Sequence, residues 1–318
     1  GNIFMKTRHK LLSLFTLITT SFIGTCAINT FIKVRAHSKH LMHSDTSLYY
    51  KWRLGKIHYT KTGQGSPLLL LHDLCPASSG CEWERILSSL SKKFTVYVPD
   101  LIGFGQSEKP DITYTNPLFM QLISDFIQSE IGRRTHVVAT GETACAVITA
   151  CKNNPDLFAN LVFISPKSPE EEMKIPGKRA KSYKFILQLP MLGNLLYNIA
   201  YSKKNIDREV EENFYHPYAV PVLLKDIYYE SAHRGDFPRS VHSSIICNYT
   251  KFNIKPALAC IDHSIALIAG ENDSDGVSAI ASMVQINPSI ESAILPKCKR
   301  LPQLELPREL LQLLNIYL

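Results

Sequence analysis

The chain has 318 residues, of which 45% are hydrophobic and 20% are charged, and its formal net charge is +7. This composition excludes a disordered chain and suffices for one large domain with an insertion. The positive charge does not indicate a nucleic-acid partner, because ten lysines and arginines lie in the first fifth of the chain, where they flank an apolar segment.

The first predicted element is an apolar helix over residues 11–32. This run contains no charged residue, and about 20 apolar residues suffice to cross a bilayer. It predicts a membrane anchor, preceded by a basic segment (1–10) and followed by a juxtamembrane linker (33–55). A cleaved signal is the alternative, since residues 25–27 are fairly small. Because a short basic N-terminal segment usually stays inside, we expect an extracytoplasmic soluble domain.

Strands and helices alternate after Lys56. Residues 56–62, followed by a turn at Gly63 and Gly65, are expected to form a hairpin with the apolar run 67–71. The other expected strands are 94–98, 135–139, 161–164, 264–270 and 290–295. The expected helices are 83–90, 118–131, 144–152, 277–284 and 307–318. This alternation predicts an α/β fold with a mostly parallel, doubly wound sheet.

The alternation stops between about residues 165 and 262. This stretch is rich in helix formers and aromatic residues and shows no strand periodicity. It predicts a helical insertion over residues 167–262, which divides the core into a first part (56–166) and a second part (263–318).

One motif after the strand at 94–98 is specific. The segment VYVPDLIGFGQSEKP (96–110) combines an apolar strand with Asp100, Gly103, Gly105, Ser107 and Pro110. It closely resembles the segment after the third strand of α/β-hydrolases. The resemblance covers nearly everything after Lys56 and implies the α/β-hydrolase fold, with the helical insertion as a cap like that of esterases, epoxide hydrolases and dehalogenases.

The nucleophile of that family lies in a G-x-S-x-G turn between a strand and a helix. Here the corresponding stretch, VVATGETAC (137–145), contains no serine. Counting back from Pro155 puts Gly141 at the nucleophile position, and glycine has no atom that could attack a carbonyl. A second register makes Thr143 the nucleophile, although a β-branched residue at positive φ is costly. Both registers remain open at this stage.

The family's base position is substituted in this chain, whereas its acid position is kept. Arg300 stands where the resemblance expects the catalytic histidine, and arginine cannot accept a proton at working pH. Asp273 follows its strand as the family's acid does. We therefore expect Asp273 and Arg300 to form an ion pair in the former triad pocket; the alternative is that Asp273 is only a turn residue.

The expected oxyanion-hole positions carry acidic residues. His72 and Asp73 resemble the family's H-G tract with the glycine replaced, and Glu142 follows the nucleophile position. Negative charge is unfavourable beside a developing oxyanion. The chain thus departs from the family pattern at four positions together: Asp73, Gly141, Glu142 and Arg300. This favours a pocket that is no longer used for acyl transfer.

These observations predict a membrane-anchored hydrolase homologue that is not catalytic by the Ser-His-acid route and binds a small apolar ligand or a protein partner. The alternative is an active hydrolase of carboxylic esters or related bonds, using Asp273 with Thr143 or with a cap histidine (His216, His233 or His242). No cofactor is expected. The eight cysteines show no metal-ligand spacing, so no metal site is expected either, although a Cys75–Cys81 disulfide is conceivable.

Overall fold

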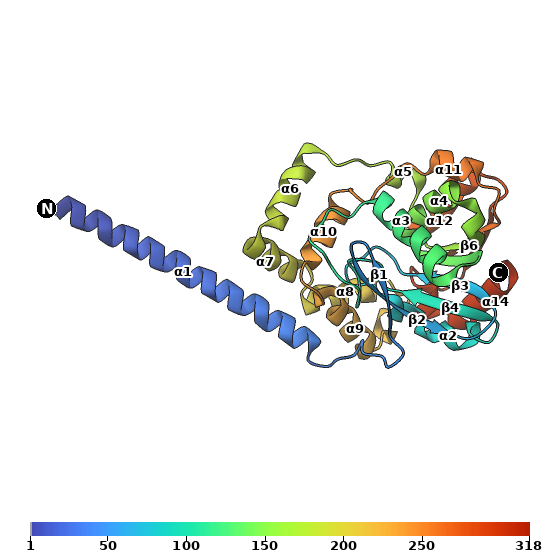
Figure 1. The fold of residues 1–318 in the computed structure, drawn as a ribbon, viewed down its shortest axis with the longest axis horizontal. Coiled ribbons are helices and arrows are strands. Elements are labelled where there is room, and N and C mark those ends of the chain that lie inside the picture. The colour runs from blue at the N-terminus through green and yellow to red at the C-terminus, as the bar shows by residue number, and fades with distance from the viewer. Residues whose placement is uncertain (1) are drawn as a thin grey trace.

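The computed structural model describes the backbone of residues 2–318 and the side chains of residues 10–318. An eight-stranded sheet with the order β1-β2-β4-β3-β5-β6-β7-β8 forms the centre of the domain that follows helix α1, Asn2–His37 (Figure 1). All neighbours from β4 to β8 are parallel, whereas β1 and β2 join antiparallel. The strands are β1 (Leu48–Trp52), β2 (Gly55–Thr62), β3 (Ser66–Leu71), β4 (Phe94–Pro99), β5 (Thr135–Thr140), β6 (Phe158–Ile164), β7 (Ile265–Gly270) and β8 (Glu291–Leu295).

The apolar run of β3 explains why both faces of the sheet are covered. Leu69 and Leu71 belong to one buried cluster, together with residues of α3 and α4, whereas Leu68 and Leu70 belong to a second cluster with residues of α2 and α14. Successive side chains of a strand point to opposite faces, so an unbroken apolar run requires helices on both sides. The core helices are α2 (Glu84–Leu90), α3 (Asn116–Phe126), α4 (Thr143–Asn153), α12 (Ser274–Ile286), α13 (Pro302–Glu305) and α14 (Pro307–Tyr317).

The insertion after β6 is helical, with no strand between residues 165 and 262. It covers the carboxyl end of the sheet, where the candidate site lies. Its helices are α5 (Pro169–Glu172), α6 (Lys178–Gln188), α7 (Pro190–Ala200), α8 (Lys203–Glu212), α9 (Val222–His233), α10 (Pro238–Ile246) and α11 (Lys255–Cys260).

Two expectations at the start of the domain are wrong. β2 does not form a hairpin with β3. It pairs with β1 and β4, with Tyr59 opposite Pro99, because the turn at Gly63 and Gly65 carries the chain one strand further into the sheet. The predicted linker is also not wholly irregular, since its last part forms the edge strand β1.

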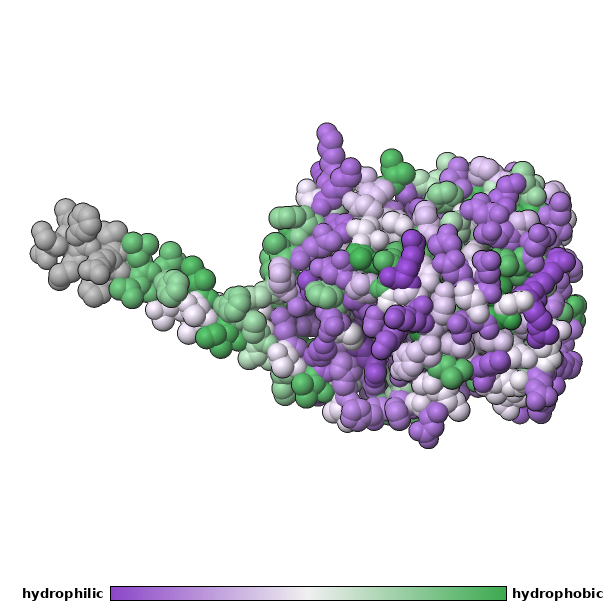
Figure 2. Space-filling view, viewed as in Figure 1, coloured by the Kyte–Doolittle hydropathy of each residue, from purple (hydrophilic) through white to green (hydrophobic). Residues whose placement is uncertain are grey.

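The N-terminal helix α1 (Asn2–His37) extends away from the domain (Figure 1). From Leu11 to Val34 most of its apolar side chains are exposed, and Figure 2 shows it as a projecting, largely green rod. From Lys10 to His37 it is long and apolar enough to cross a membrane, with a mean hydropathy of 1.9, a property that N-terminal signal sequences share. The end of α1 contacts the cap, where Asn198 donates to Asn29 at 2.7 Å and Lys33 pairs with Asp236.

Candidate active-site pocket

Gly141 forms the tip of the turn between β5 and α4. Its φ of +57° lies in the left-handed region, which glycine adopts without steric cost, and its N–H donates to the Ile164 carbonyl at 3.0 Å. Thr143 is instead the first residue of α4, is fully buried, and donates its hydroxyl to the His72 carbonyl at 2.6 Å. The register with Thr143 at the tip is therefore wrong, because the sharp turn needs positive φ two residues earlier.

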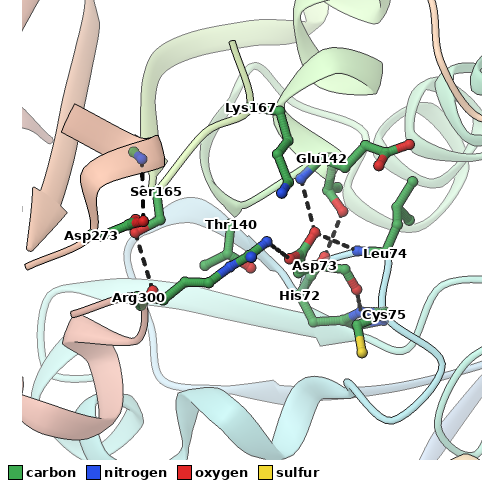
Figure 3. A network of polar contacts seen from close by, with 12 residues as sticks. His72, Asp73, Leu74, Cys75, Thr140, Glu142, Ser165, Lys167, Asp273 and Arg300 are labelled. Atoms are coloured by element: carbon green, nitrogen blue, oxygen red, sulfur yellow. Dashed lines mark hydrogen bonds and ion pairs between the residues drawn. The ribbon is translucent and has the colours of Figure 1, made fainter. Parts of the chain in front are cut away.

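The carboxylate of Asp73 fills the space above Gly141. A Cβ atom on Gly141 would lie 2.1 Å from the Asp73 carboxyl carbon. One Asp73 oxygen, Oδ1, accepts the backbone N–H of Leu74 at 2.7 Å and that of Glu142 at 2.8 Å (Figure 3). An oxyanion hole of this fold consists of the N–H after the nucleophile and an N–H from the loop after β3. The Asp73 carboxylate therefore occupies the place that a developing oxyanion would take.

Arg300 holds the other oxygen of Asp73. Its Nη2 lies 3.0 Å from Asp73 Oδ2, and the two side chains are 30% and 15% exposed (Figure 3). Burial alone would raise the pKa of Asp73, but the Arg300 guanidinium, the positive charge of Lys167 and the two N–H donors lower it below its usual value. The arrangement thus fixes a carboxylate anion against a permanent cation, with neither a free hydroxyl nor a proton acceptor at the tip.

The expected ion pair between Asp273 and Arg300 is wrong. Asp273 is the N-cap of α12, and its Oδ1 accepts the Gly276 N–H at 3.2 Å. An unpaired N–H at a helix start competes strongly for a short carboxylate. The negative charge of Asp273 still contributes to raising the pKa of Arg300, so the residue lies near the pocket but is not paired there.

The sequence profile of the alpha/beta hydrolase family matches residues 68–313, most of the chain. The chain belongs to the α/β-hydrolase family. Among curated proteins, a soluble epoxide hydrolase from Corynebacterium sp. (strain C12) is 46% identical over 55 residues, which are 17% of this chain and 18% of that protein. A haloalkane dehalogenase from Agrobacterium fabrum is 31% identical over 111 residues, 35% of this chain and 36% of the relative. The chain thus matches well under half the length of these curated relatives.

Solved structures share the fold of this α/β-hydrolase family member across nearly its whole length. A serine hydrolase involved in carbazole degradation has a TM-score of 0.71 at 14% identity and covers 85% of this chain and 97% of its own. A carboxylesterase from Bacillus subtilis has a TM-score of 0.67 at 18% identity, covering 92% and 98%. A bacterial membrane phospholipase A has a TM-score of 0.67 at 17% identity, covering 98% and 97%.

In this α/β-hydrolase chain, the other two expected oxyanion-hole residues have structural contacts. His72 is fully buried. Its Nδ1 lies 2.8 Å from the Asp73 carbonyl, its Nε2 accepts the Leu101 N–H at 3.0 Å, and burial lowers its pKa. Glu142 contributes its backbone N–H to Asp73, while its side chain turns away and pairs with Lys251 at 3.0 Å. Leu74, whose N–H completes the donor pair, was not identified from the sequence, because a backbone donor leaves no residue-type signal.

Two cavities flank the Asp73–Arg300 pair. One, of about 130 Å³, is lined by this pair, Glu82 and Glu209 together with apolar side chains of α8. The other, of about 290 Å³, is lined by the pair, charged residues and the end of α10. Among the residues that the structure describes, no group of His, Cys, Asp and Glu side chains is arranged to hold a metal ion. Cys75 and Cys81 are free thiols, so the conceivable disulfide is not formed.

Two of the cap histidines are held within the cap. His233 Nδ1 lies 2.9 Å from the Tyr229 carbonyl, and His242 Nδ1 lies 3.1 Å from the Tyr201 hydroxyl. Burial lowers the pKa of both imidazoles to about 4. His216 precedes a short turn at residues 217–219. Thr143 therefore gains no imidazole partner, since its hydroxyl is bonded to the His72 carbonyl.

The structure brings together a hydroxyl, an imidazole and a carboxylate at another place. Ser47 Oγ lies 2.9 Å from His58 Nε2, and His58 Nδ1 lies 3.0 Å from Asp100 Oδ2. A cavity of about 300 Å³ adjoins His58 and Asp100. Asp100 also accepts the backbone N–H groups of Gly80 and Gln106, at 2.7 and 2.8 Å. Sequence reasoning missed this chain of hydrogen bonds, because it depends on the pairing of β2 with β4.

Proposed function

We propose that this α/β-hydrolase family member does not catalyse acyl transfer by the Ser-His-acid route and that its capped pocket binds a ligand or partner instead. One observation supports this most strongly: the Asp73 carboxylate takes both oxyanion-hole N–H groups, above a turn whose tip is Gly141. An incoming carbonyl oxygen would have to displace a paired anion before it could reach those donors. Even then, Gly141 offers no nucleophile and Arg300 accepts no proton.

The proposed ligand is small and carries an apolar part, because the 130 Å³ cavity combines the Asp73–Arg300 pair with Ile206, Val210 and Leu301. A protein partner on the cap is the other proposed occupant. We also propose that α1 anchors the protein in a membrane with the soluble domain extracytoplasmic. The membrane phospholipase A structure supports the anchor, because its alignment covers 98% of the 318 residues and therefore includes most of α1.

Labelling with a fluorophosphonate probe, together with hydrolysis of short p-nitrophenyl esters, tests the loss of catalysis. The full chain is expected to remain unlabelled and to leave ester hydrolysis at the background rate. A matched variant restores the family pattern with Asp73→Gly, Gly141→Ser and Arg300→His, and it is expected to gain labelling. Labelling or turnover by the unaltered chain would overturn the proposal.

A hydrolase that acts by another route is the second candidate, and two observations favour it. The proteins that the chain resembles are named as hydrolases, and Ser47, His58 and Asp100 form a hydroxyl–imidazole–carboxylate chain beside a cavity. If the unaltered chain hydrolyses esters, this candidate requires Ser47→Ala to abolish the turnover. Thr143→Ala is the matched control, because its hydroxyl is buried and bonded to a carbonyl.

A further inference from the structure

One stretch of the cap exposes apolar and basic side chains together. Residues 173–201, which include α6 and α7, contain five lysines and arginines and no aspartate or glutamate. Four of the five basic residues are exposed: Lys174, Lys178, Arg179 and Lys181. Eight large apolar side chains in the same stretch are exposed as well. These are Met173, Ile175, Tyr183, Phe185, Ile186, Leu189, Leu192 and Ile199. Apolar side chains gathered this densely at a surface indicate an interaction site.

The apolar side chains of this stretch gather on α7 and the adjoining end of α6. On α7, Leu192 and Ile199 are seven residues apart, so they lie on one side of the helix, where they are 44% and 58% exposed. Phe185 is 66% exposed near the end of α6, and Leu189 is exposed at the junction of the two helices. We call these four residues the α6–α7 surface.

The α6–α7 surface lies beside α1. Asn198, next to Ile199 on α7, donates to Asn29 of α1 at 2.7 Å. In Figure 1, α6 and α7 form the edge of the domain that faces the free half of α1, and Figure 2 shows green residues along this edge. The exposed apolar surface of α1 therefore continues onto the cap.

The level of this contact along α1 places the surface near a bilayer boundary. The uncharged run of α1 ends at Ile32, so Asn29 lies only about 4.5 Å inside that end at the helical rise of about 1.5 Å per residue. The whole run, residues 11–32, spans about 33 Å, close to the hydrocarbon thickness of about 30 Å. With α1 in a membrane, α7 thus meets the bilayer where hydrocarbon gives way to headgroups.

We infer that the α6–α7 surface of the cap rests on the lipid bilayer that α1 spans. Its apolar side chains enter the boundary of the acyl region, and the exposed basic residues beside them face anionic headgroups. This combination, with no acidic residue in the stretch, is the composition of helices that lie in a membrane interface. A bilayer fits better than a protein partner, because the surface continues directly from α1. The inference relies on the proposed anchor.

Tryptophan quenching tests the contact in the full chain, reconstituted into vesicles of phosphatidylcholine and phosphatidylglycerol with brominated acyl chains. The native tryptophans are buried, Trp52 at 5% exposure and Trp83 at 0%, and give a weakly quenched background. Phe185→Trp is expected to lose about half of its added emission, as for a side chain about 5–10 Å into the boundary. Leu192→Trp provides an independent second position on the same surface.

Ile316→Trp is the matched control, because Ile316 is 72% exposed on α14, at the end of the domain away from α1 (Figure 1). Its added emission is expected to stay unquenched. If the protein resists carbonate extraction but neither cap variant is quenched more than the control, the inference is wrong and the anchor stands. If carbonate releases the protein, the anchor itself fails, and the inference fails with it.

Discussion

Two aspartates at the carboxyl ends of neighbouring strands make similar contacts with different outcomes. Asp73 follows β3 and Asp100 follows β4, and each carboxylate accepts two backbone N–H groups. The third partner of Asp73 is the guanidinium of Arg300, whereas that of Asp100 is the imidazole of His58, which also contacts Ser47. At both places the carboxylate already occupies the nearby N–H groups. The turn at Gly141 has neither a nucleophile nor a proton acceptor, whereas Asp100 lies in a chain with an imidazole and a hydroxyl. The third partner of each carboxylate, rather than the aspartate itself, therefore distinguishes the two places.

The largest expected effect is at Asp100. Asp100→Ala should lower the free energy of unfolding by about 3–5 kcal/mol, because the buried Asp100 carboxylate is the acceptor of three hydrogen bonds that are lost at once. Urea unfolding of the full chain in detergent measures this. Asp262→Ala, at an exposed position, is the control and should change little. A loss below about 1 kcal/mol would mean that Asp100 does not hold the loop after β4.

Glu82 is another carboxylate for the comparison. It is buried, at 2% exposure, and no cation pairs with it. Burial raises its pKa to about 7, although the Tyr228 hydroxyl donates to it. Because this pKa is higher in the folded state, the protonated carboxyl contributes its full stability below about pH 4.5. That contribution is lost as the pH rises through about 7. Glu82→Gln should therefore be more stable than the unaltered chain at pH 8, by up to about 3 kcal/mol, and equally stable at pH 4. Urea unfolding of both proteins at the two pH values tests this. If the variant and the unaltered chain differ in stability by the same amount at pH 8 and at pH 4, the prediction is wrong.

Arg300→Gln removes the cation that pairs with Asp73 and leaves the contacts of Asp100 unchanged. It should lower the free energy of unfolding by about 1–2 kcal/mol, less than a fully buried pair, because both side chains keep partial exposure. The lowered pKa of Asp73 contributes stability that is present above the unfolded pKa of about 4 and is lost as the pH falls. The variant should lose less stability between pH 6 and pH 3 than the unaltered chain does. Arg300→Lys, which keeps the charge, should lie between the two.

The smallest expected effect is at Ser47. Ser47→Ala should lower the free energy of unfolding by only about 0.5–1 kcal/mol, because one partly exposed hydrogen bond is lost. No change in ester hydrolysis or probe labelling is expected. If the unaltered chain shows turnover and this variant loses it, the chain of Ser47, His58 and Asp100 is catalytic, and the two aspartates do not differ as described.

Most of the core could be predicted from the sequence, because buried parallel strands are continuous apolar runs and the motif at residues 96–110 is specific. The edge strand β1 could not, since it lies in a charged stretch and is mostly exposed. The hairpin prediction failed for a related reason: local turn signals do not reveal which strand the chain pairs with after the turn.

The candidate site was predictable in its parts but not in its contacts. Positive φ at Gly141 follows from the turn that the sequence requires, and the glycine identity is visible directly. The position of the Asp73 carboxylate above Gly141 depends on a side chain reaching between two strands, which no spacing rule describes. The Asp273–Arg300 pair failed because helix capping competed for the same carboxylate.

The contacts between the end of α1 and the cap determine how the domain is placed relative to α1. Lys39 pairs with Asp226 at 2.7 Å and the Leu41 N–H donates to Glu230 at 2.8 Å, in addition to the bonds at Asn29 and Lys33. These four polar contacts lie between residues 29 and 41, so they join the end of α1 and the segment that follows it to the cap. If α1 spans a membrane as proposed, these contacts, rather than the length of a linker, orient the domain. Shortening residues 38–47 would then disrupt the contacts of Lys39 and Leu41 instead of bringing the domain closer to the bilayer.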